Sequence, residues 1–314
     1  MSSDVQVVGL GLATLDVLIR LNEMPTWGHS SRIQGFGFDG GGLVGTAMVA
    51  AARLGVRVGF CGTAGTDVSS EIKLRSMVQA GIDLSHLCHR PGPEDQVVIV
   101  YVHADTGERQ FSGIQPRPST PLRVQELDRD YITAADYLHI DGFHYEASLQ
   151  AAKWMREAGK TVVMDGSKTD GPVSERQRSL VPLVDVLITG SGFARGLTGC
   201  ADIWRAGQAI LEMGPRIFVE TVGDEGSYTV TPTEQFRIPA FEVDVVDTTG
   251  AGDVYHGAYI VALLQGWSAR HCALFATAAS AIKCKQLGGR AGIPSFNEVM
   301  CFLRDRNHDI PSAA

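Results

Sequence analysis

The chain has 314 residues, of which 44% are hydrophobic, and it carries a formal net charge of −8. This length and composition allow one large globular α/β domain with a well-buried core. The acidic balance excludes an extended nucleic-acid interface, which needs concentrated lysine and arginine, although a local basic pocket for one anionic ligand stays compatible with it.

Six cysteines are scattered along the sequence. None forms a Cys-x-x-Cys pair or a metal-ligand spacing with histidine, which favours reduced thiols over a disulfide framework or a zinc site. The N-terminus shows no secretory signal pattern, and no segment approaches the roughly 18 apolar residues that a membrane span needs. We therefore predict a cytoplasmic protein without a membrane or nucleic-acid partner.

Strands and helices are predicted to alternate along most of the chain, from short apolar runs and from Ala-rich or periodic runs that stop at glycine. The first half holds strand Val5–Gly9, extended pieces Val17–Leu21 and Ser31–Phe38, helix Thr46–Leu54, strand Val56–Cys61, helix Ser69–Ala80, and a hairpin of Val97–His103 with Arg109–Phe111. The second half holds strand Tyr137–Ile140, helix Ala147–Ala158, strands Thr161–Asp165 and Val186–Thr189, helix Ile203–Met213, strands Ile217–Thr221 and Ser227–Thr231, and helices Asp253–Gln265 and Ala269–Cys284.

This alternation implies a parallel sheet with helical crossovers. The segments near residues 17–38 and 97–113 break the rhythm, because they have the pattern of hairpins, and we predict that they form a small antiparallel sheet inserted into the main domain. No internal repeat, low-complexity tract or linker interrupts the chain. The prediction is therefore a single domain over residues 1–314.

The most informative string is Asp247-Thr248-Thr249-Gly250-Ala251-Gly252-Asp253. It lies between an extended segment, Phe241–Val246, and an apolar helix, so its glycines leave backbone N–H groups unobstructed at a helix N-terminus. Such donors bind an anion and stabilise charge that grows during a reaction. Asp253, at the edge of the same turn, can take a proton from an attacking hydroxyl. The alternative for so short a motif is an aspartate that only favours the helix N-terminus behind an ordinary glycine turn.

This string resembles the second signature of the ribokinase-like (PfkB) carbohydrate kinase family, and weaker matches follow the family's order along nearly the whole chain. They are Gly9, Gly11 and Asp16; Gly41, Gly42 and Ala52–Gly55; Gly62, Gly65 and Asp67; Gly107–Arg109; Leu197–Gly199; Thr221–Gly226; and Gly288–Pro294. The resemblance implies a three-layer α/β/α sandwich, in which the two hairpin segments form a small β-sheet lid. It also implies transfer of the γ-phosphate of ATP to a hydroxyl of a small carbohydrate.

The resemblance further implies a role for individual residues. Asp253 would be the general base, and the backbone N–H groups of Gly250, Ala251 and Gly252 would form the anion hole. The implied sugar site comprises Asp16, Gly41, Gly42, Thr46, Arg109 and Asp141, and the implied nucleotide site comprises Lys168, Thr221, Gly223, Gly226, Thr249 and Gly289. The implied cofactors are ATP and Mg²⁺, with a monovalent cation as a further candidate, and the lid is expected to pair two copies into a homodimer.

Two positions depart from the family pattern. Thr46 stands where the first signature usually has an asparagine, and Gly190-Ser191-Gly192-Phe193 stands where many members carry an Asn-x-x-Glu linked to magnesium and phosphate. No residue is therefore assigned as a ligand of the metal, and its protein contacts stay open. Mg²⁺ would be held mostly by ATP phosphates and water, which suits its reluctance to dehydrate.

Local likenesses within the family bear on the acceptor. The strings Phe241–Gly257 and Gly288–Pro294 are similar to sulfofructose kinase, but in the family this part of the chain serves the nucleotide and catalysis and not the choice of sugar. His139–Gly142 is similar to ketohexokinase, so a ketose is the expected sugar. The positions where a sulfonate-binding Lys, Asn and Arg are expected hold His29, Ser112 or Gly113, and Phe143, which argues against sulfofructose itself.

Two alternative functions stay open. A nucleoside kinase of the same family would need an aromatic slot for the base, for which Phe36, Phe38 and Phe143 are candidates. A non-catalytic sugar or nucleotide sensor could share the scaffold, although a sensor has no need of a base. Individual residues also have plainer explanations: a turn for Asp16, a solvated loop for Lys168 and an exposed hairpin position for Arg109.

Overall fold

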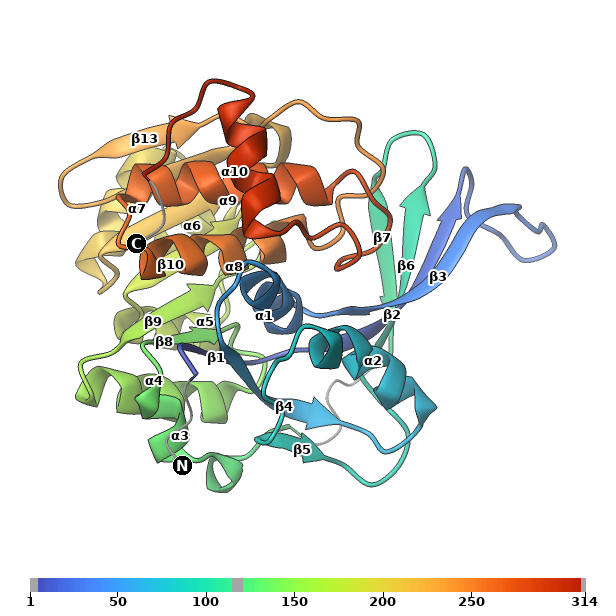
Figure 1. The fold of residues 1–314 in the computed structure, drawn as a ribbon, viewed down its shortest axis with the longest axis horizontal. Helices are drawn as coiled ribbons and strands as arrows, with labels where there is room; N and C mark the ends of the chain where they lie inside the picture. The colour runs from blue at the N-terminus through green and yellow to red at the C-terminus, as the bar shows by residue number, and fades with distance from the viewer. Residues whose placement is uncertain (1–4, 115–120, 312–314) are drawn as a thin grey trace.

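The computed structural model describes residues 5–114 and 121–311. Its centre is a nine-stranded sheet with the strand order β13-β12-β11-β10-β9-β8-β1-β4-β5 (Figure 1). All pairs from β5 to β11 are parallel, and β12 and β13 turn back antiparallel. The strands are β1 (Val7–Leu10), β4 (Val58–Ala64), β5 (Leu87–His89), β8 (Tyr137–Ile140), β9 (Thr161–Asp165), β10 (Val186–Gly190), β11 (Ile217–Thr221), β12 (Ser227–Val230) and β13 (Gln235–Ile238).

Helices cover both faces of this sheet, so the predicted three-layer α/β/α sandwich is confirmed (Figure 1). Successive strand residues such as Val7 and Val8 enter opposite cores, which explains why the central strands are apolar without alternation. One face carries α1 (Leu43–Arg53), α2 (Val68–Gln79), α8 (Ala251–Leu264), α9 (Ala269–Lys283) and α10 (Phe296–Arg304). The other carries α3 (Arg129–Ala134), α4 (Tyr145–Glu157), α5 (Glu175–Leu180), α6 (Phe193–Thr198) and α7 (Ile203–Glu212).

Helix α8 is apolar on all sides because it lies between other elements instead of at the surface. Its residues 254–262 are all buried, as expected for a helix without a polar face. Gly257 allows α1 to approach closely, since a Cβ atom there would lie only 2.2 Å from the carbonyl oxygen of Ala47. The central position of α8 fixes where its N-terminus opens.

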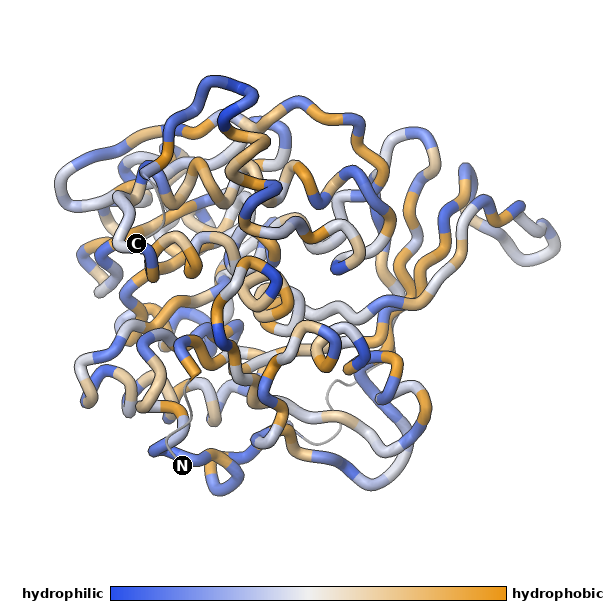
Figure 2. Tube along the Cα trace, in the orientation of Figure 1, coloured by the Kyte–Doolittle hydropathy of each residue, from blue (hydrophilic) through white to orange (hydrophobic). Residues whose placement is uncertain are grey.

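A second sheet projects from the edge of the main body and is called the lid below (Figure 1). Its strand order is β3-β2-β6-β7, with β2 (Thr14–Leu21), β3 (Ile33–Gly41), β6 (Val97–His103) and β7 (Arg109–Gly113). Leu18, Val100 and Val102 are buried on the face where Leu287 of the main body packs. Hydrophobic stretches continue along the lid strands beyond this contact (Figure 2).

The lid sheet is mixed, and the prediction of an antiparallel sheet was wrong in this respect. Strands β2–β3 and β6–β7 are antiparallel hairpins, but β2 and β6 pair in parallel, with Asp16 opposite Val98. Between the two hairpins the chain returns to the main body through α1, β4, α2 and β5. Both hairpins therefore leave the body in the same direction, and their first strands meet side by side.

Three further boundaries differ from the prediction. Asp16 lies within β2 and not in a turn before it, and α8 begins at Ala251, two residues before the predicted start. Phe241–Val246 forms no strand. The N–H groups of Val246 and Asp247 instead both donate to the carbonyl oxygen of Cys284 at the end of α9. This contact spans almost 40 residues of chain, which local sequence patterns do not capture.

A buried ion pair joins α2 to the start of β6. Lys73 Nζ lies 3.0 Å from a carboxylate oxygen of Glu94, and both side chains are fully buried. Lys73 also donates to the carbonyl oxygen of Thr63. Burial lowers the pKa of Lys73 to about 8, against the opposing effect of Glu94. Within residues 5–114 and 121–311, none of the helices has the length and apolar character needed to cross a membrane.

Candidate active site

The glycine-rich turn meets the N-terminus of α8. Gly250 is the N-cap residue and has a left-handed backbone with φ of 73°, which glycine adopts without strain. A Cβ atom at Gly250 would lie 2.8 Å from the carbonyl oxygen of Gly289, so the turn packs against the loop that follows α9. The N–H of Ala251 donates to the carbonyl oxygen of Thr248 at 3.2 Å. One of the three predicted anion donors is therefore already engaged within the turn.

Asp247 holds this turn from behind. One oxygen of its buried carboxylate accepts the N–H of Thr249 at 2.7 Å, and the other accepts the N–H of Gly288 at 2.8 Å. The side chain thus connects the turn to the glycine loop 288–289. A carboxylate with two charge-assisted backbone bonds fixes both segments against each other.

Asp253 lies in the first turn of α8, at the edge of the glycine turn, and is partly exposed. Desolvation is the largest effect on its pKa, and it raises that pKa well above the ordinary value. The carboxylates of Asp165 and Asp16 raise it further, while Arg109 and Arg290 oppose the shift. These groups therefore surround one carboxylate that binds a proton more strongly than a free aspartate does.

Asp16 lies on β2 with its carboxylate against Gly41 of β3. A Cβ atom at Gly41 would lie 2.1 Å from an oxygen of Asp16, so only glycine leaves room for this side chain. The hydroxyl of Thr14 donates to Asp16 at 2.6 Å. Gly42, with φ of 86°, caps α1 immediately after it. Asp16, Gly41 and Gly42 are therefore brought together, as the sequence predicted.

Arg290 is a fully buried cation that the sequence analysis did not identify. Its guanidinium donates to the carbonyl oxygen of Gly41 at 2.5 Å, to Ser76 Oγ at 2.9 Å and to Thr46 Oγ1 at 3.3 Å. Its backbone N–H donates to Asp39 at 2.9 Å. Burial lowers the pKa of Arg290 to about 10, so it stays charged at neutral pH. Thr46 lies in α1, shortly after Gly41 and Gly42, with its hydroxyl bonded to Arg290.

A buried polar cluster lies behind Asp253. His256, one helical turn along α8, places Nε2 3.4 Å from an oxygen of Asp165 at the end of β9. The ring centroids of His139 and His256 are 5.3 Å apart. Burial lowers the pKa of each histidine to about 3, so both are neutral. The sequence analysis did not assign Asp165 or His256 to the site.

Asp141 follows β8 on the same side of the sheet. Its two carboxylate oxygens accept the N–H groups of Leu12 and Phe143, at 2.9 and 2.8 Å. Burial raises its pKa to about 7, against these two hydrogen bonds. Both oxygens of the carboxylate that was predicted to bind the sugar are thus engaged by backbone N–H groups.

The lid touches the glycine-rich turn through Arg109. Its guanidinium donates to the hydroxyl of Thr248, and that hydroxyl faces the carbonyl oxygen of Gly107 at 3.4 Å. Between the lid and the main body lies a cavity of about 660 Å³ whose lining includes Arg109, Lys168 and Thr248. Its size falls in the range of small-molecule sites. It brings together a predicted sugar residue, a predicted nucleotide residue and the turn.

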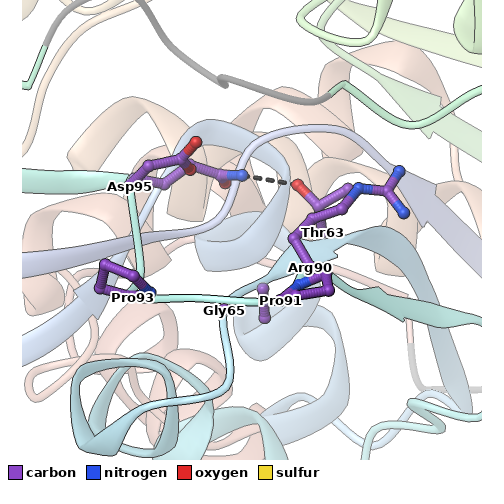
Figure 3. Close-up of a pocket in the computed structure, with 8 residues that line it drawn as sticks. Thr63, Gly65, Arg90, Pro91, Pro93 and Asp95 are labelled. Atoms are coloured by element: carbon purple, nitrogen blue, oxygen red, sulfur yellow. Dashed lines mark hydrogen bonds between the residues drawn. The ribbon is translucent and has the colours of Figure 1, made fainter.

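A smaller cavity of about 140 Å³ opens at the carboxyl end of β4, at the root of the lid (Figure 3). Thr63, Arg90 and Asp95 contribute to its lining. The amide of Gln96 donates to Thr63 Oγ1 at 2.6 Å across it, and Arg90 is paired with Glu126 at 2.7 Å. None of the residues predicted for sugar or nucleotide belongs to this lining.

The predicted nucleotide residues lie around the ends of β9, β10 and β11. The hydroxyl of Thr221 donates to the carbonyl oxygen of Thr189 at 3.1 Å, and Gly223 and Gly226 have positive φ. Lys168 is exposed on the loop after β9. The hydroxyl of Thr249 is buried, and no hydrogen-bond partner for it exists in the described part of the chain. Gly289 lies 3.9 Å from the methyl group of Thr249, measured from its ideal Cβ position.

The side chain of Glu220, on β11, reaches the turn at residues 190–193, where the family's Asn-x-x-Glu is missing. Its carboxylate accepts the N–H groups of Gly192 and Ala194, at 3.1 and 2.8 Å, and so caps α6. In residues 5–114 and 121–311, no group of three His, Cys, Asp or Glu side chains is arranged to hold a metal ion. The residues at this turn therefore do not form a magnesium cage.

The profile of pfkB family carbohydrate kinases matches residues 6–295. The chain belongs to the pfkB family. An ATP-dependent ribose-1-phosphate kinase from Halopiger xanaduensis is 26% identical over 312 residues, with coverage of 96% of this chain and 99% of the relative. A nucleoside kinase from Methanothermobacter thermautotrophicus is 24% identical over 301 residues, and the alignment covers 96% of each chain.

The solved structures bear out the fold of this pfkB protein. An E. coli protein described as a Ribokinase II, in complex with ATP and Mg²⁺, superposes with a TM-score of 0.82 at 20% identity, covering 96% of this chain and 99% of the other. The ribokinase-like fold expected from the sequence is thereby confirmed. The chain is accordingly a phosphotransferase of the sugar and nucleoside kinase type.

The first testable consequence concerns the mouth of the glycine turn. Gly252 is exposed, and a Cβ atom there would meet nothing within 4 Å. We therefore expect Gly252→Val to fold with a melting temperature close to that of the wild type. Its side chain would fill the space in front of the turn, and kinase activity should fall by at least about 10²-fold, the usual worth of an oxyanion donor. Normal turnover by a folded variant would mean that phosphate binds elsewhere.

Proposed function

We propose that this chain transfers the γ-phosphate of Mg-ATP to a hydroxyl of a small carbohydrate, with Asp253 as the general base. One observation supports this most directly: a partly exposed carboxylate of raised pKa stands in the first helical turn beside the open N-terminus of α8. A helix N-terminus favours an anion, and the adjacent carboxylate favours a proton. Phosphoryl transfer to an alcohol needs both.

The proposed reaction depends mainly on positioning. The sugar hydroxyl gives its proton to Asp253 as its oxygen attacks the γ-phosphorus in line with the leaving ADP oxygen. The N–H groups of Gly250, Ala251 and Gly252, together with the dipole of α8, stabilise the charge on the transferring group. For Ala251 this requires its contact with Thr248 to open when phosphate binds.

We assign the sugar hydroxyls to Asp16 and to the backbone of Gly41 and Gly42. Arg109 would reach the same space from the lid, where its positive charge also lowers the pKa of Asp253. Thr46 and Asp141 would act from beneath, since their polar atoms are bonded to Arg290 and to backbone N–H groups, respectively. They would position the glycines and the strand ends and would not touch the sugar.

We place ATP along Thr221, Gly223, Gly226, Thr249 and Gly289, with Lys168 reaching a phosphate. The buried hydroxyl of Thr249 supports this, because a ligand oxygen would supply the partner that it lacks. The Glu220 carboxylate is occupied by two N–H groups. We therefore assign no protein ligand to Mg²⁺ and take the ion to arrive with the nucleotide phosphates.

The outer face of the lid supports a homodimer. Residues opposite each other in a sheet share a face, so the registers of β2 with β3 and β6 place Val17, Ile19, Phe36, Phe38, Ile99 and Tyr101 together, away from the face that packs on Leu287. Phe36 and Phe38 are 59% and 52% exposed. A contiguous apolar face of this kind favours association, and a second lid is its matching surface.

Sedimentation velocity tests this directly. We expect the wild type to sediment as a dimer and Phe36→Ser/Phe38→Ser to sediment as a monomer, because both rings are removed from the shared face. Circular dichroism should show that the variant is folded, since both side chains are already solvent-exposed. A wild type that is monomeric at micromolar concentration would exclude the lid as a dimer interface.

The alternative within the same reaction class is a nucleoside kinase. The Methanothermobacter relative supports this alternative, because it is described as a nucleoside kinase. We treat residues 1–314 as one kinase domain and test the acceptor with ATP consumption across ketoses, aldoses, sugar acids, sugar phosphates and nucleosides. A ketose is the first acceptor to try, from the likeness of residues 139–142 to ketohexokinase. Turnover confined to nucleosides would replace the sugar assignment, and no turnover with any acceptor would overturn the proposed function.

Asp253→Asn keeps the shape of the proposed base and removes its proton acceptor. We expect kcat to fall by about 10²–10⁴-fold, the usual worth of general-base catalysis, while ATP binding measured by calorimetry is retained. In the wild type the base must be ionised, so kcat/KM should decline as pH falls through the pKa of Asp253. Because that pKa is raised, the decline should occur above the usual carboxylate range. Near-normal turnover of the variant would rule out this base.

Asp16→Ala removes the proposed sugar carboxylate. We expect the KM for sugar to rise at least about tenfold, because a hydrogen bond to a charged group contributes ~1.5–3 kcal/mol. The KM for ATP should change much less, since Asp16 lies on the lid side of the turn. Steady-state kinetics with each substrate varied in turn will separate the two. Equal changes in both constants, or none, would show that Asp16 is structural.

A further inference from the structure

A second buried lysine, Lys283, lies directly behind the catalytic turn. It is the last residue of α9, and its Nζ donates to the carbonyl oxygen of Asp247 at 2.9 Å. Its side chain has no exposure to solvent. Asp247 is the residue whose carboxylate fixes Thr249 and Gly288. The ammonium therefore acts on the residue whose carboxylate ties the anion-binding turn to the loop after α9.

Neighbouring groups of α9 reinforce the same contact. Ser280 Oγ donates to the carbonyl oxygen of Ala251 at 2.8 Å, and the carbonyl oxygen of Cys284 accepts the N–H groups of Val246 and Asp247. The C-terminal end of α9 thus contacts the turn through three groups, which are the hydroxyl of Ser280, the ammonium of Lys283 and the carbonyl oxygen of Cys284. A cation at a helix C-terminus is also favoured by the helix dipole.

The carboxylates near Lys283 favour its ammonium form. Burial, and to a lesser extent the charge of Arg109, lowers the pKa of Lys283, and the carboxylates of Asp247 and Asp253 oppose this shift. The interaction with Asp253 shows that the ammonium lies within electrostatic range of the proposed base. A positive charge behind the anion hole would stabilise the negative charge that grows in front of it during transfer.

We propose that the ammonium of Lys283 is a built-in cation of the anion-binding turn and replaces the dissociable monovalent cation that the family resemblance implies. The inference rests on the proposed kinase function. Lys283 is a positioning residue, because it reaches the reacting groups through the Asp247 carbonyl and the α8 turn. The consequence is an enzyme whose activity does not depend on K⁺.

The surroundings of Asp247 do not suit an added cation. Its carbonyl oxygen already accepts Lys283, and each of its carboxylate oxygens accepts a backbone N–H group. A dissociable cation would need several free oxygen ligands in this space and would be repelled by the ammonium at short range. The position beside this carbonyl oxygen is therefore occupied by the ammonium of Lys283, which is part of the chain and cannot dissociate.

The primary test uses the wild-type protein. Turnover with the acceptor identified by the panel is measured in KCl, NaCl and tetramethylammonium chloride at constant ionic strength. We expect the three rates to agree within about twofold, a free-energy difference smaller than that of one hydrogen bond. A several-fold loss of rate when K⁺ is replaced by tetramethylammonium overturns the proposal, whereas the kinase function itself stands.

Lys283→Met provides the second test, with Lys73→Met as the matched control because it removes another fully buried ammonium away from the turn. We expect Lys283→Met to lose at least about tenfold in kcat, in line with loss of a charge-assisted hydrogen bond, and to regain part of it in KCl but not in tetramethylammonium chloride. The ligand-free variant should also gain thermal stability specifically in KCl. Lys73→Met should show neither response.

The outcomes separate this inference from the proposed function. A folded Lys283→Met with wild-type turnover, or with the same salt response as Lys73→Met, overturns the built-in cation. If Lys283→Met does not fold, the comparison of salts on the wild type decides. If no acceptor is phosphorylated, the proposed function fails, and the melting temperatures of the ligand-free proteins in the two salts still show whether Lys283 excludes K⁺.

Discussion

The N-terminus of α8 must be open in front and held firmly behind, and Asp247 meets the second requirement. Its carboxylate accepts one N–H from the turn and one from the loop after α9, while its carbonyl oxygen accepts Lys283. A helix N-terminus has unpaired donors by geometry, and a turn with glycines around it would otherwise have many conformations. The bonds to Asp247 select one of them. The rest of the site is arranged around that fixed point.

Two buried cations lie at the joints, which are the places where separate segments of the chain pack together. Arg290 connects the end of β3 to α1 and α2, and Lys73 connects α2 to the start of β6. Each cation donates to backbone carbonyl oxygens or is paired with a carboxylate, which offsets the cost of its burial. Both joints lie where the lid strands enter the main body. They give the lid a defined root, while Arg109 and Gly107 contact the turn at its far end.

The buried cluster of Asp165, His256 and His139 gives the site a second, less obvious feature. Neutral histidines cannot compensate the charge of Asp165 fully, so its carboxylate acts on Asp253 through the low-dielectric interior. The raised pKa of Asp253 therefore comes first from its burial and then from the charges of Asp165 and Asp16, and not from one residue. An acceptor carboxylate with that property takes a proton at neutral pH more readily than an exposed aspartate would.

The sequence by itself determined the features that depend on near neighbours in the chain. Strand–helix alternation, the glycine turn and the first turn of α8 follow from local periodicity, backbone freedom and helix-end geometry, and Asp253 was proposed as the base on these grounds. Only the tertiary structure decided what depends on segments far apart. The parallel pairing of β2 with β6, the occupied carboxylate of Asp141, the bond between Thr46 and Arg290, and the contact of Lys283 with Asp247 all involve such pairs. The sequence shows that a lysine within an apolar stretch, such as Lys283, needs a hydrogen-bond acceptor when it is buried. Only the packing of the helices shows which carbonyl or carboxylate oxygen accepts that bond.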